Sequence, residues 1–272
     1  MDFNPYFYKP MFRTRFQYLV NIQYLGFRYA GWQKQPKQKT IAGMLDKTLR
    51  FIWPETTFKV VGANRTDARV SSLAGAFLLI TENFEIPDFP TFIGDMNRNL
   101  PADIRITAIE NAPEDFNIIQ DVAVKEYRYL FSFQEKQHPF CAPIMANFPY
   151  PLNVKAMQDA ACVFVGTHDF SAFTVRDAVH KDCTRTVLDA HIVPNTEYSA
   201  NYFPKESFLF LVRGKGFLRY QIRMMMGALV LLGKGELSQE ELETMLRNEK
   251  AGEQHFIAPG SGLFLAEMEF DL

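Results

Sequence analysis

Apolar and polar positions alternate at the start of this chain. Between Phe16 and Tyr24 every second residue is apolar or aromatic, and Gln or Asn side chains occupy positions between them. A period of two is typical of a β-strand with one buried face. After a polar loop, Thr40 precedes apolar residues spaced three and four apart as far as Ile52, and Pro54 follows. This second pattern predicts an N-capped amphipathic helix.

The same two patterns continue through the first half of the chain. They predict strands over residues 58–61, 74–81 and 104–109 and a helix over residues 90–99, with a polar loop at residues 62–72. The resulting order is β-α-β-β-α-β, which is the order of a split β-α-β unit.

The second half repeats this order loosely. Strands are expected at 127–133, 186–193, 207–212 and 263–270, and helices after Asn153, over 217–232 and after Ser238, where Glu241 completes a capping box. The predicted fold class is therefore α+β. We expect three parts, an N-terminal extension at residues 1–14, an α/β half at 15–112 and a second α/β half at 116–272.

Composition and charge narrow the possible partners. The 29 basic and 31 acidic residues leave a net charge of −2, so nucleic-acid binding requires a local basic face rather than a global field. Cys141, Cys162 and Cys183 lack metal-knuckle spacing and predict no disulfide scaffold, which fits a reducing cytoplasm. The longest apolar run, residues 224–232, is about half of the ~20 residues that a membrane span needs. We expect a cytoplasmic protein without a membrane segment.

The loop at residues 62–69 carries candidate chemistry. Arg65 and Asp67 lie two residues apart between two apolar strands, close enough for a charge-assisted contact. An arginine beside a carboxylate keeps it ionised, as a nucleophile or a base requires. A solvated aspartate in a surface turn is the alternative, and spacing alone favours it.

Two further segments combine aromatic and basic residues. Tyr127 and Tyr129 alternate on a predicted strand, which fits core packing or a ring that stacks on a nucleobase with its hydroxyl free for proton chemistry. Residues 213–223 interleave glycines, four cations and aromatic rings, which suits an RNA backbone. Within this segment Arg219 and Arg223 are four apart and share a helical face. A solvated basic turn is the alternative.

Several motifs of other enzyme classes are missing from the sequence. It has no nucleotide-binding glycine loop, no nucleophile elbow and no histidine pair with metal-ligand spacing, so we expect no cofactor and no metal. A glycoside or nucleoside hydrolase would need a second carboxylate beside Asp67. Glu126 is the nearest candidate by motif, but adjacent side chains of a strand face opposite sides, so Glu126 and Tyr127 cannot share one pocket.

Seven short motifs follow one another along the chain. They are Tyr24-Leu25-Gly26-Phe27 with Gly31-Trp32-Gln33-Lys34-Gln35; Asn64-Arg65-Thr66-Asp67; Asn99-Leu100-Pro101-Ala102-Asp103-Ile104; Tyr127-Arg128-Tyr129; Gly166-Thr167-His168-Asp169-Phe170-Ser171-Ala172-Phe173; residues 217–227; and Gly262-Leu263. Each motif is weak alone, but the seven in this order resemble the tRNA pseudouridine synthase A (TruA) family from about Arg15 onward.

This resemblance implies a fold and a reaction. Two α/β halves of RRM-like, or ferredoxin-like, order share a central, mainly antiparallel sheet with helices packed on it, and RNA lies in a basic cleft. Members act as homodimers in which one tRNA contacts both subunits. They convert uridine to pseudouridine by breaking the C1′–N1 bond, rotating the base and rejoining it through C5, without a cofactor or metal. The implied default substrate is the anticodon arm of tRNA.

The resemblance also implies residue roles. Asp67 matches the catalytic aspartate, which acts at C1′ as a nucleophile or at C2′ as a base. Arg65 and Arg223 match arginines that orient this aspartate or hold RNA near it. Tyr127 matches the ring that stacks on the target base and assists proton removal from C5. The residues expected to bind the substrate RNA are Tyr127, Arg219, Lys215, Gln33 and Lys34.

The chain departs from the family's pattern near this aspartate. The usual Gly-Arg-Thr-Asp-x-Gly-Val-His has Asn64, Arg69 and Ser71 in place of its two glycines and its histidine. Arginine suits a left-handed backbone less well than glycine does. The family's Phe-His-Ala-Arg becomes Phe-Asn-Ile-Ile, and Ile119 cannot replace a cation directed at RNA. Three outcomes stay open: a synthase acting on the family's usual RNA, a synthase with a different RNA, and a catalytically impaired RNA-binding protein on the same scaffold.

Overall fold

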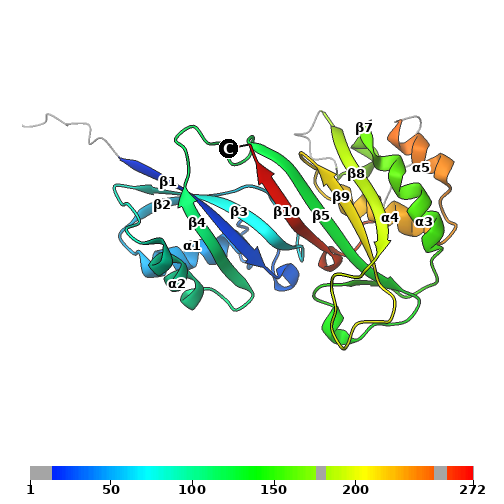
Figure 1. Cartoon of the computed structure of the whole chain (residues 1–272), viewed down its shortest axis with the longest axis horizontal. Helices are drawn as coiled ribbons and strands as arrows, with labels where there is room; N and C mark the ends of the chain where they lie inside the picture. Colours follow the sequence, from blue (N-terminus) through cyan, green and yellow to red (C-terminus); the bar gives the residue numbers. More distant parts are fainter. Residues whose placement is uncertain (1–13, 176–181, 248–255, 272) are drawn as a thin grey trace, which may run out of the picture.

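The computed structural model describes residues 14–175, 182–247 and 256–271, so the predicted extension at 1–14 lies outside them except for Thr14. Within these residues, ten strands form one sheet (Figure 1): β1 (Arg15–Tyr24), β2 (Thr57–Gly62), β3 (Ser71–Glu82), β4 (Ile104–Asn111), β5 (Val122–Phe133), β6 (Ala146–Phe148), β7 (Gly166–Asp169), β8 (Thr184–Pro194), β9 (Phe208–Gly214) and β10 (Leu263–Phe270). The α-helices of the same residues are α1 (Ile41–Ile52), α2 (Phe89–Asn99), α3 (Val154–Ala161), α4 (Gln221–Gly233) and α5 (Gln239–Leu246). Among them, no helix has both the length and the apolar composition needed to cross a membrane.

The sheet is mixed and mostly antiparallel. Only β10 with β3 and β5 with β6 pair in parallel among the described strands. The α+β class predicted from the sequence is confirmed in this form, a large mixed sheet with five α-helices in the described residues.

Two groups of strands meet in the middle of the sheet (Figure 1). The first group has the order β4-β1-β3, with β2 beside the later part of β3, and the second has the order β10-β5-β9-β8-β7. Strand β10 joins the groups because it pairs with β5 and also with β3 through Phe264–Ser71 and Leu265–Ser72. Helices α1 and α2 lie with the first group, and α3, α4 and α5 lie with the second (Figure 1).

Each group of strands has its own buried core. The first core packs α1 and α2 against β1 and β3, around side chains such as Tyr18 and Phe77. The second core packs α3, α4 and α5 with β5, β8, β9 and β10, and includes the three methionines at residues 224–226. A smaller cluster contains Phe116 and Ile118, so the polar segment at residues 111–115 leads directly into buried side chains.

The structure differs from the sequence prediction at the start of α4. The helix begins at Gln221 rather than at residue 217, because Tyr220 has a left-handed backbone with a φ of 63°. A left-handed residue cannot form part of a right-handed helix. The Gln221 side chain instead accepts a hydrogen bond of 2.8 Å from the Leu218 amide. Strand β5 begins at Val122 rather than at residue 127, and the short strands β6 and β7 were not predicted.

A substitution at Gly260 tests the close packing between the segment before β10 and the loop before β3. A Cβ atom on Gly260 would lie 2.4 Å from the carbonyl oxygen of Ala68, a backbone atom that cannot rotate away. We expect Gly260→Ala to lower the free energy of unfolding by about 1–3 kcal/mol in urea denaturation.

Gly94 provides the matched control. It is exposed within α2, and a Cβ atom there would meet nothing within 4 Å. Gly94→Ala should raise the free energy of unfolding by about 0.5–1 kcal/mol, because alanine favours a helix. Equal effects of the two substitutions would contradict the packing argument.

Candidate active site

Hydrogen bonds hold the loop at residues 63–70, which joins β2 to β3. The Trp32 amide donates to the Thr66 carbonyl (3.0 Å), and the Arg69 amide donates to the Tyr29 carbonyl (3.1 Å). The hydroxyls of Tyr24 and Thr66 share a buried hydrogen bond of 2.9 Å. The segment from the end of β1 to the start of α1 therefore supports the loop that carries the candidate aspartate.

Two glycines in that segment allow this close contact. A Cβ atom on Gly31 would lie 2.6 Å from the Thr66 carbonyl oxygen, and one on Gly26 would lie 1.9 Å from that of Val70. Gly31 also has a φ of 102°, which side chains other than glycine rarely allow. The structure thus explains why both glycines stand in the first motif.

The fold accommodates two of the sequence's departures from the family pattern. Arg69 adopts a left-handed backbone with a φ of 66°, as its glycine-like position requires, and its guanidinium lies 5.5 Å from the centre of the Phe27 ring. The Ser71 hydroxyl accepts a hydrogen bond of 2.9 Å from the Gly26 amide. Both side chains therefore contact the segment that supports the Asp67 loop.

Asp67 forms its ion pair with Arg223 of α4. The Arg223 Nη1 atom lies 3.3 Å from Oδ2 of Asp67, and the two side chains are only 13% and 16% exposed. The Arg223 Nε atom also donates to the Ala258 carbonyl (2.8 Å), which fixes the guanidinium. The expected contact between Arg65 and Asp67 is therefore wrong for this structure. Arg65 is exposed and makes no ion pair with any described residue, because the loop turns at Asp67 and directs its carboxylate toward α4.

Burial dominates the electrostatics of Asp67. Loss of solvent raises the pKa of its carboxyl group above the ordinary value, while the positive charges of Arg223 and Arg219 oppose this shift. The arginines thus reduce the cost of burial without cancelling it. A carboxylate in this setting is poorly solvated, which increases its reactivity toward an electrophile or a proton.

Tyr127 lies close to this ion pair. Its side chain is 9% exposed, and its hydroxyl oxygen accepts a long hydrogen bond (3.4 Å) from Nδ2 of Asn64. The Phe217 ring packs edge-on against the tyrosine, with ring centres 5.5 Å apart. Burial, with a smaller contribution from the negative charge of Asp67, raises the pKa of Tyr127 to about 12. Asp67, Arg223 and Tyr127, which are far apart in sequence, are therefore neighbours in the fold.

Lys125 is a further residue of the site, one that was not predicted from the sequence. Its Nζ atom donates to the Ala63 carbonyl (3.1 Å) and so joins β5 to the start of the Asp67 loop. Burial lowers the pKa of Lys125 to about 8. Strand periodicity contained the signal, because Lys125 stands two residues before Tyr127 and shares its face of the strand.

The remaining predicted binding residues lie at differing places around the site. Arg219 is exposed and its charge acts on Asp67. Lys215 and Gln33 are exposed, and Lys34 forms an ion pair of 2.7 Å with Asp46. In the described part of the chain, none of Lys215, Gln33 and Lys34 bonds to Asp67 or Tyr127. These three side chains thus belong to the surroundings of the ion pair rather than to its immediate contacts.

Glu126 lies outside this group of side chains. Its carboxylate accepts a hydrogen bond of 2.7 Å from Nε of Arg128, which also contacts Glu197 and Tyr198. Glu126 and Arg128 share one face of β5, and Tyr127 is buried on the other. A hydrolase would require a second carboxylate beside Asp67, and Glu126 does not supply it.

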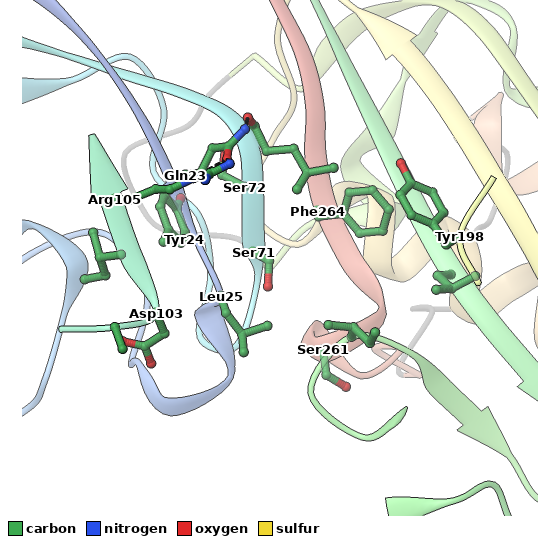
Figure 2. Close-up of a pocket in the computed structure, with 15 residues that line it drawn as sticks. Gln23, Tyr24, Leu25, Ser71, Ser72, Asp103, Arg105, Tyr198, Ser261 and Phe264 are labelled. Carbon is green, nitrogen blue, oxygen red and sulfur yellow. Dashed lines mark hydrogen bonds between the residues drawn. The ribbon is translucent and has the colours of Figure 1, made fainter. Parts of the chain in front are cut away.

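A separate cavity of about 320 Å³ lies where the two groups of strands meet (Figure 2). Ser72 and Phe264 line it from β3 and β10, and Tyr198 lies beside Phe264 (Figure 2). Asp67, Tyr127 and Arg223 are not among its lining residues. In residues 14–175, 182–247 and 256–271, no group of three or more His, Cys, Asp or Glu side chains could hold a metal ion.

Known proteins resemble this chain along most of its length. A family model described as tRNA pseudouridine synthase matches residues 160–271. The tRNA pseudouridine synthase A of Exiguobacterium sibiricum is 32% identical over 252 residues, which cover 93% of this chain and 96% of that protein. The protein of the same name from Halalkalibacterium halodurans is 31% identical over 245 residues, covering 90% and 89%. That from Streptococcus agalactiae is 29% identical over 258 residues, covering 94% and 95%.

These matches confirm the resemblance carried by the seven motifs. They span both groups of strands, including the Asp67 loop and the start of α4. The chain therefore belongs to the tRNA pseudouridine synthase A (TruA) family.

Proposed function

We propose that this protein is a pseudouridine synthase that isomerises uridine in tRNA, with the anticodon arm as its target region. Membership of the TruA family supports the reaction class. The observation that carries the proposal is the buried pair of Asp67 and Arg223 with Tyr127 beside it. A poorly solvated carboxylate beside an aromatic ring suits a reaction at the ribose carbon of a nucleotide whose base stacks on that ring.

The proposed reaction adds and removes no atoms overall. The C1′–N1 bond breaks, a C1′–C5 bond forms, C5 loses its proton and N1 gains one. Asp67 acts either as the nucleophile at C1′ or as the base at C2′. Tyr127 stacks on the target base and assists proton removal from C5, and Arg223 holds the Asp67 carboxylate in position.

We infer a different role for Arg65 from the one that spacing alone suggested. Since its side chain is exposed and Asp67 is paired with Arg223, Arg65 is free to contact the RNA near the target nucleotide. Arg219, Lys215, Gln33 and Lys34 supply further contacts to the RNA, through charge and hydrogen bonds to phosphates.

Wider features of the family also belong to this proposal. The first group of strands has the order β-α-β-β-α-β, and the second has the same order apart from the added β6, β7 and α5. This order supports two RRM-like, or ferredoxin-like, halves at 15–112 and 116–272 that flank an RNA-binding cleft. We propose that the protein acts as a homodimer in the cytoplasm, without a cofactor or a metal.

A second candidate function is RNA binding without catalysis. Ile119, which stands where the family has an RNA-directed arginine, is 59% exposed. This observation favours altered RNA recognition. The contacts of Arg69 and Ser71, in contrast, leave the loop around Asp67 intact and favour retained chemistry.

Tritium release tests the reaction itself. With unmodified tRNA transcripts that carry 5-tritiated uridine, the wild type should release tritium, and Asp67→Ala should release it more slowly by a factor on the order of 10³ or more. Asp159→Asn is the matched control, because it removes an exposed carboxylate of α3 that pairs only with Lys155 among the described ion pairs. Tight RNA binding without release, from tRNA and from a broad pool of cellular RNA, would favour the second function.

The pH dependence tests the role of Arg223. Catalysis requires ionised Asp67, and burial raises its pKa, so the rate should fall with decreasing pH at a higher pH than an ordinary aspartate would give. Arg223→Gln removes the charge that lowers this pKa and should move the acid limb upward by about 1 unit in single-turnover rates. Arg247→Gln, which breaks an exposed pair with Glu243, should leave the limb unchanged. An unmoved limb in Arg223→Gln would exclude the proposed coupling.

Removal of the Tyr127 hydroxyl tests whether this residue assists proton transfer or only binds the RNA. Tyr127→Phe keeps the ring and its edge-on contact with Phe217 but lacks the proton-bearing oxygen. We expect tRNA affinity within about 2-fold of the wild type and a product rate lower by about 10²-fold, since general acid–base groups contribute about that much. A filter-binding measurement and a single-turnover assay separate the two effects. Loss of affinity with an unchanged rate would assign Tyr127 to binding alone.

A further inference from the structure

Tyr220 has an unusual backbone beside the candidate site. It is the N-cap residue of α4, with φ and ψ of 63° and 0°, and it makes no side-chain capping bond. Left-handed backbone is costly for residues other than glycine and occasionally asparagine or aspartate. Such a conformation persists only where its surroundings impose it, and it is enriched at functional sites. Here the Met224 amide donates to the Tyr220 carbonyl (2.9 Å), and Gln221 and Leu218 exchange hydrogen bonds across the turn.

The Tyr220 ring contacts two cations. The guanidinium carbons of Arg219 and Arg223 each lie 5.0 Å from the ring centre. The Arg219 Nη2 atom also lies 3.4 Å from the tyrosine hydroxyl oxygen. Two like charges repel, whereas the negative face of an aromatic ring attracts both. The ring therefore offers the two guanidiniums one shared favourable contact that offsets part of their repulsion.

Both cations act on the same carboxylate. Arg223 bonds to Asp67 at 3.3 Å, and Arg219 contributes a further favourable charge. The backbone of Arg219 is itself fixed, because the Thr174 hydroxyl donates to its carbonyl (2.9 Å). The Thr174 hydroxyl holds the backbone of Arg219, and the Ala258 carbonyl holds the Nε of Arg223. The Tyr220 ring is a direct contact that the two guanidiniums share.

We propose that Tyr220 is a positioning residue whose ring gathers Arg219 and Arg223 beside Asp67. This inference rests on the proposed function and deepens it, because it assigns to the Tyr220 ring the placement of the two arginines that act on Asp67. It also explains why a tyrosine occupies a left-handed position that glycine or asparagine would fill more easily. The ring is needed there, and the turn that aims it requires the strained backbone.

Three substitutions of Tyr220 separate the ring from the backbone. Tyr220→Leu removes the aromatic face and keeps the strain, Tyr220→Asn removes the ring and tolerates the left-handed backbone, and Tyr220→Phe keeps the ring. We expect single-turnover rates about 10-fold lower in the Leu and Asn variants, with a smaller change in KM. The Phe variant should restore most of the rate that the Leu variant loses. In Tm, the Asn variant should exceed the Leu variant by about 2–4 °C, because it relieves the strain.

The pKa of Asp67 provides a readout that a merely structural role would not move. In carbon-13 NMR titrations of the aspartate carboxyls, assigned with Asp67→Asn, we expect the Asp67 pKa to rise by about half a unit in the Leu and Asn variants but not in the Phe variant. Phe58→Leu is the matched control, since it removes a ring with Arg50 at 5.3 Å from β2 in the first group of strands. That variant should leave both the rate and the Asp67 pKa unchanged.

The outcomes distinguish this inference from the proposed function. An unchanged Asp67 pKa in the Leu and Asn variants, or rate losses that follow Tm alone, would overturn the role of Tyr220 even in an active synthase. A shifted pKa in a protein that releases no tritium from any RNA would instead overturn the synthase function and leave the role of Tyr220 standing.

Discussion

Burial of the Asp67 carboxylate is the constraint on which the arrangement of the site depends. A charged group removed from water requires a counter-charge and fixed hydrogen-bond partners. The partner that bonds to Asp67 is Arg223, which comes from α4, whereas Asp67 comes from the loop before β3. The segment at residues 256–260 completes the arrangement, since Ala258 fixes Arg223 and Gly260 packs against the Asp67 loop.

The site therefore exists only where the two groups of strands meet. Each group has its own core, but β10 makes just two residue pairs with β3. Further contacts across this junction, the Asp67–Arg223 ion pair and the hydrogen bond from Lys125 to Ala63, come from the site itself. The side chains of the proposed site therefore also help to hold the two groups of strands together.

Strained backbone flanks the ion pair on both sides. Arg69 lies two residues after Asp67 and Tyr220 lies three residues before Arg223, and both have left-handed backbone. Each also has a cation–ring contact, with Phe27 and with the two arginines respectively. The strain is supported by the bonds around each turn, and it directs the two side chains of the pair toward one another.

Sequence pattern alone determined the α+β class and the order of the α-helices and of all the strands except the short β6 and β7, because periods of two and of three to four reflect local burial. Motif order determined the family. The pattern also placed Thr40 and Ser238 at the starts of helices, since capping depends on residues within one turn. It could not determine that Arg223 rather than Arg65 pairs with Asp67, that Lys125 reaches Ala63, or that α4 begins at Gln221. Those features were decided by the tertiary structure, because they depend on how two separately packed groups of strands meet. Asp67 and Arg223, which touch there, are 156 positions apart in the chain.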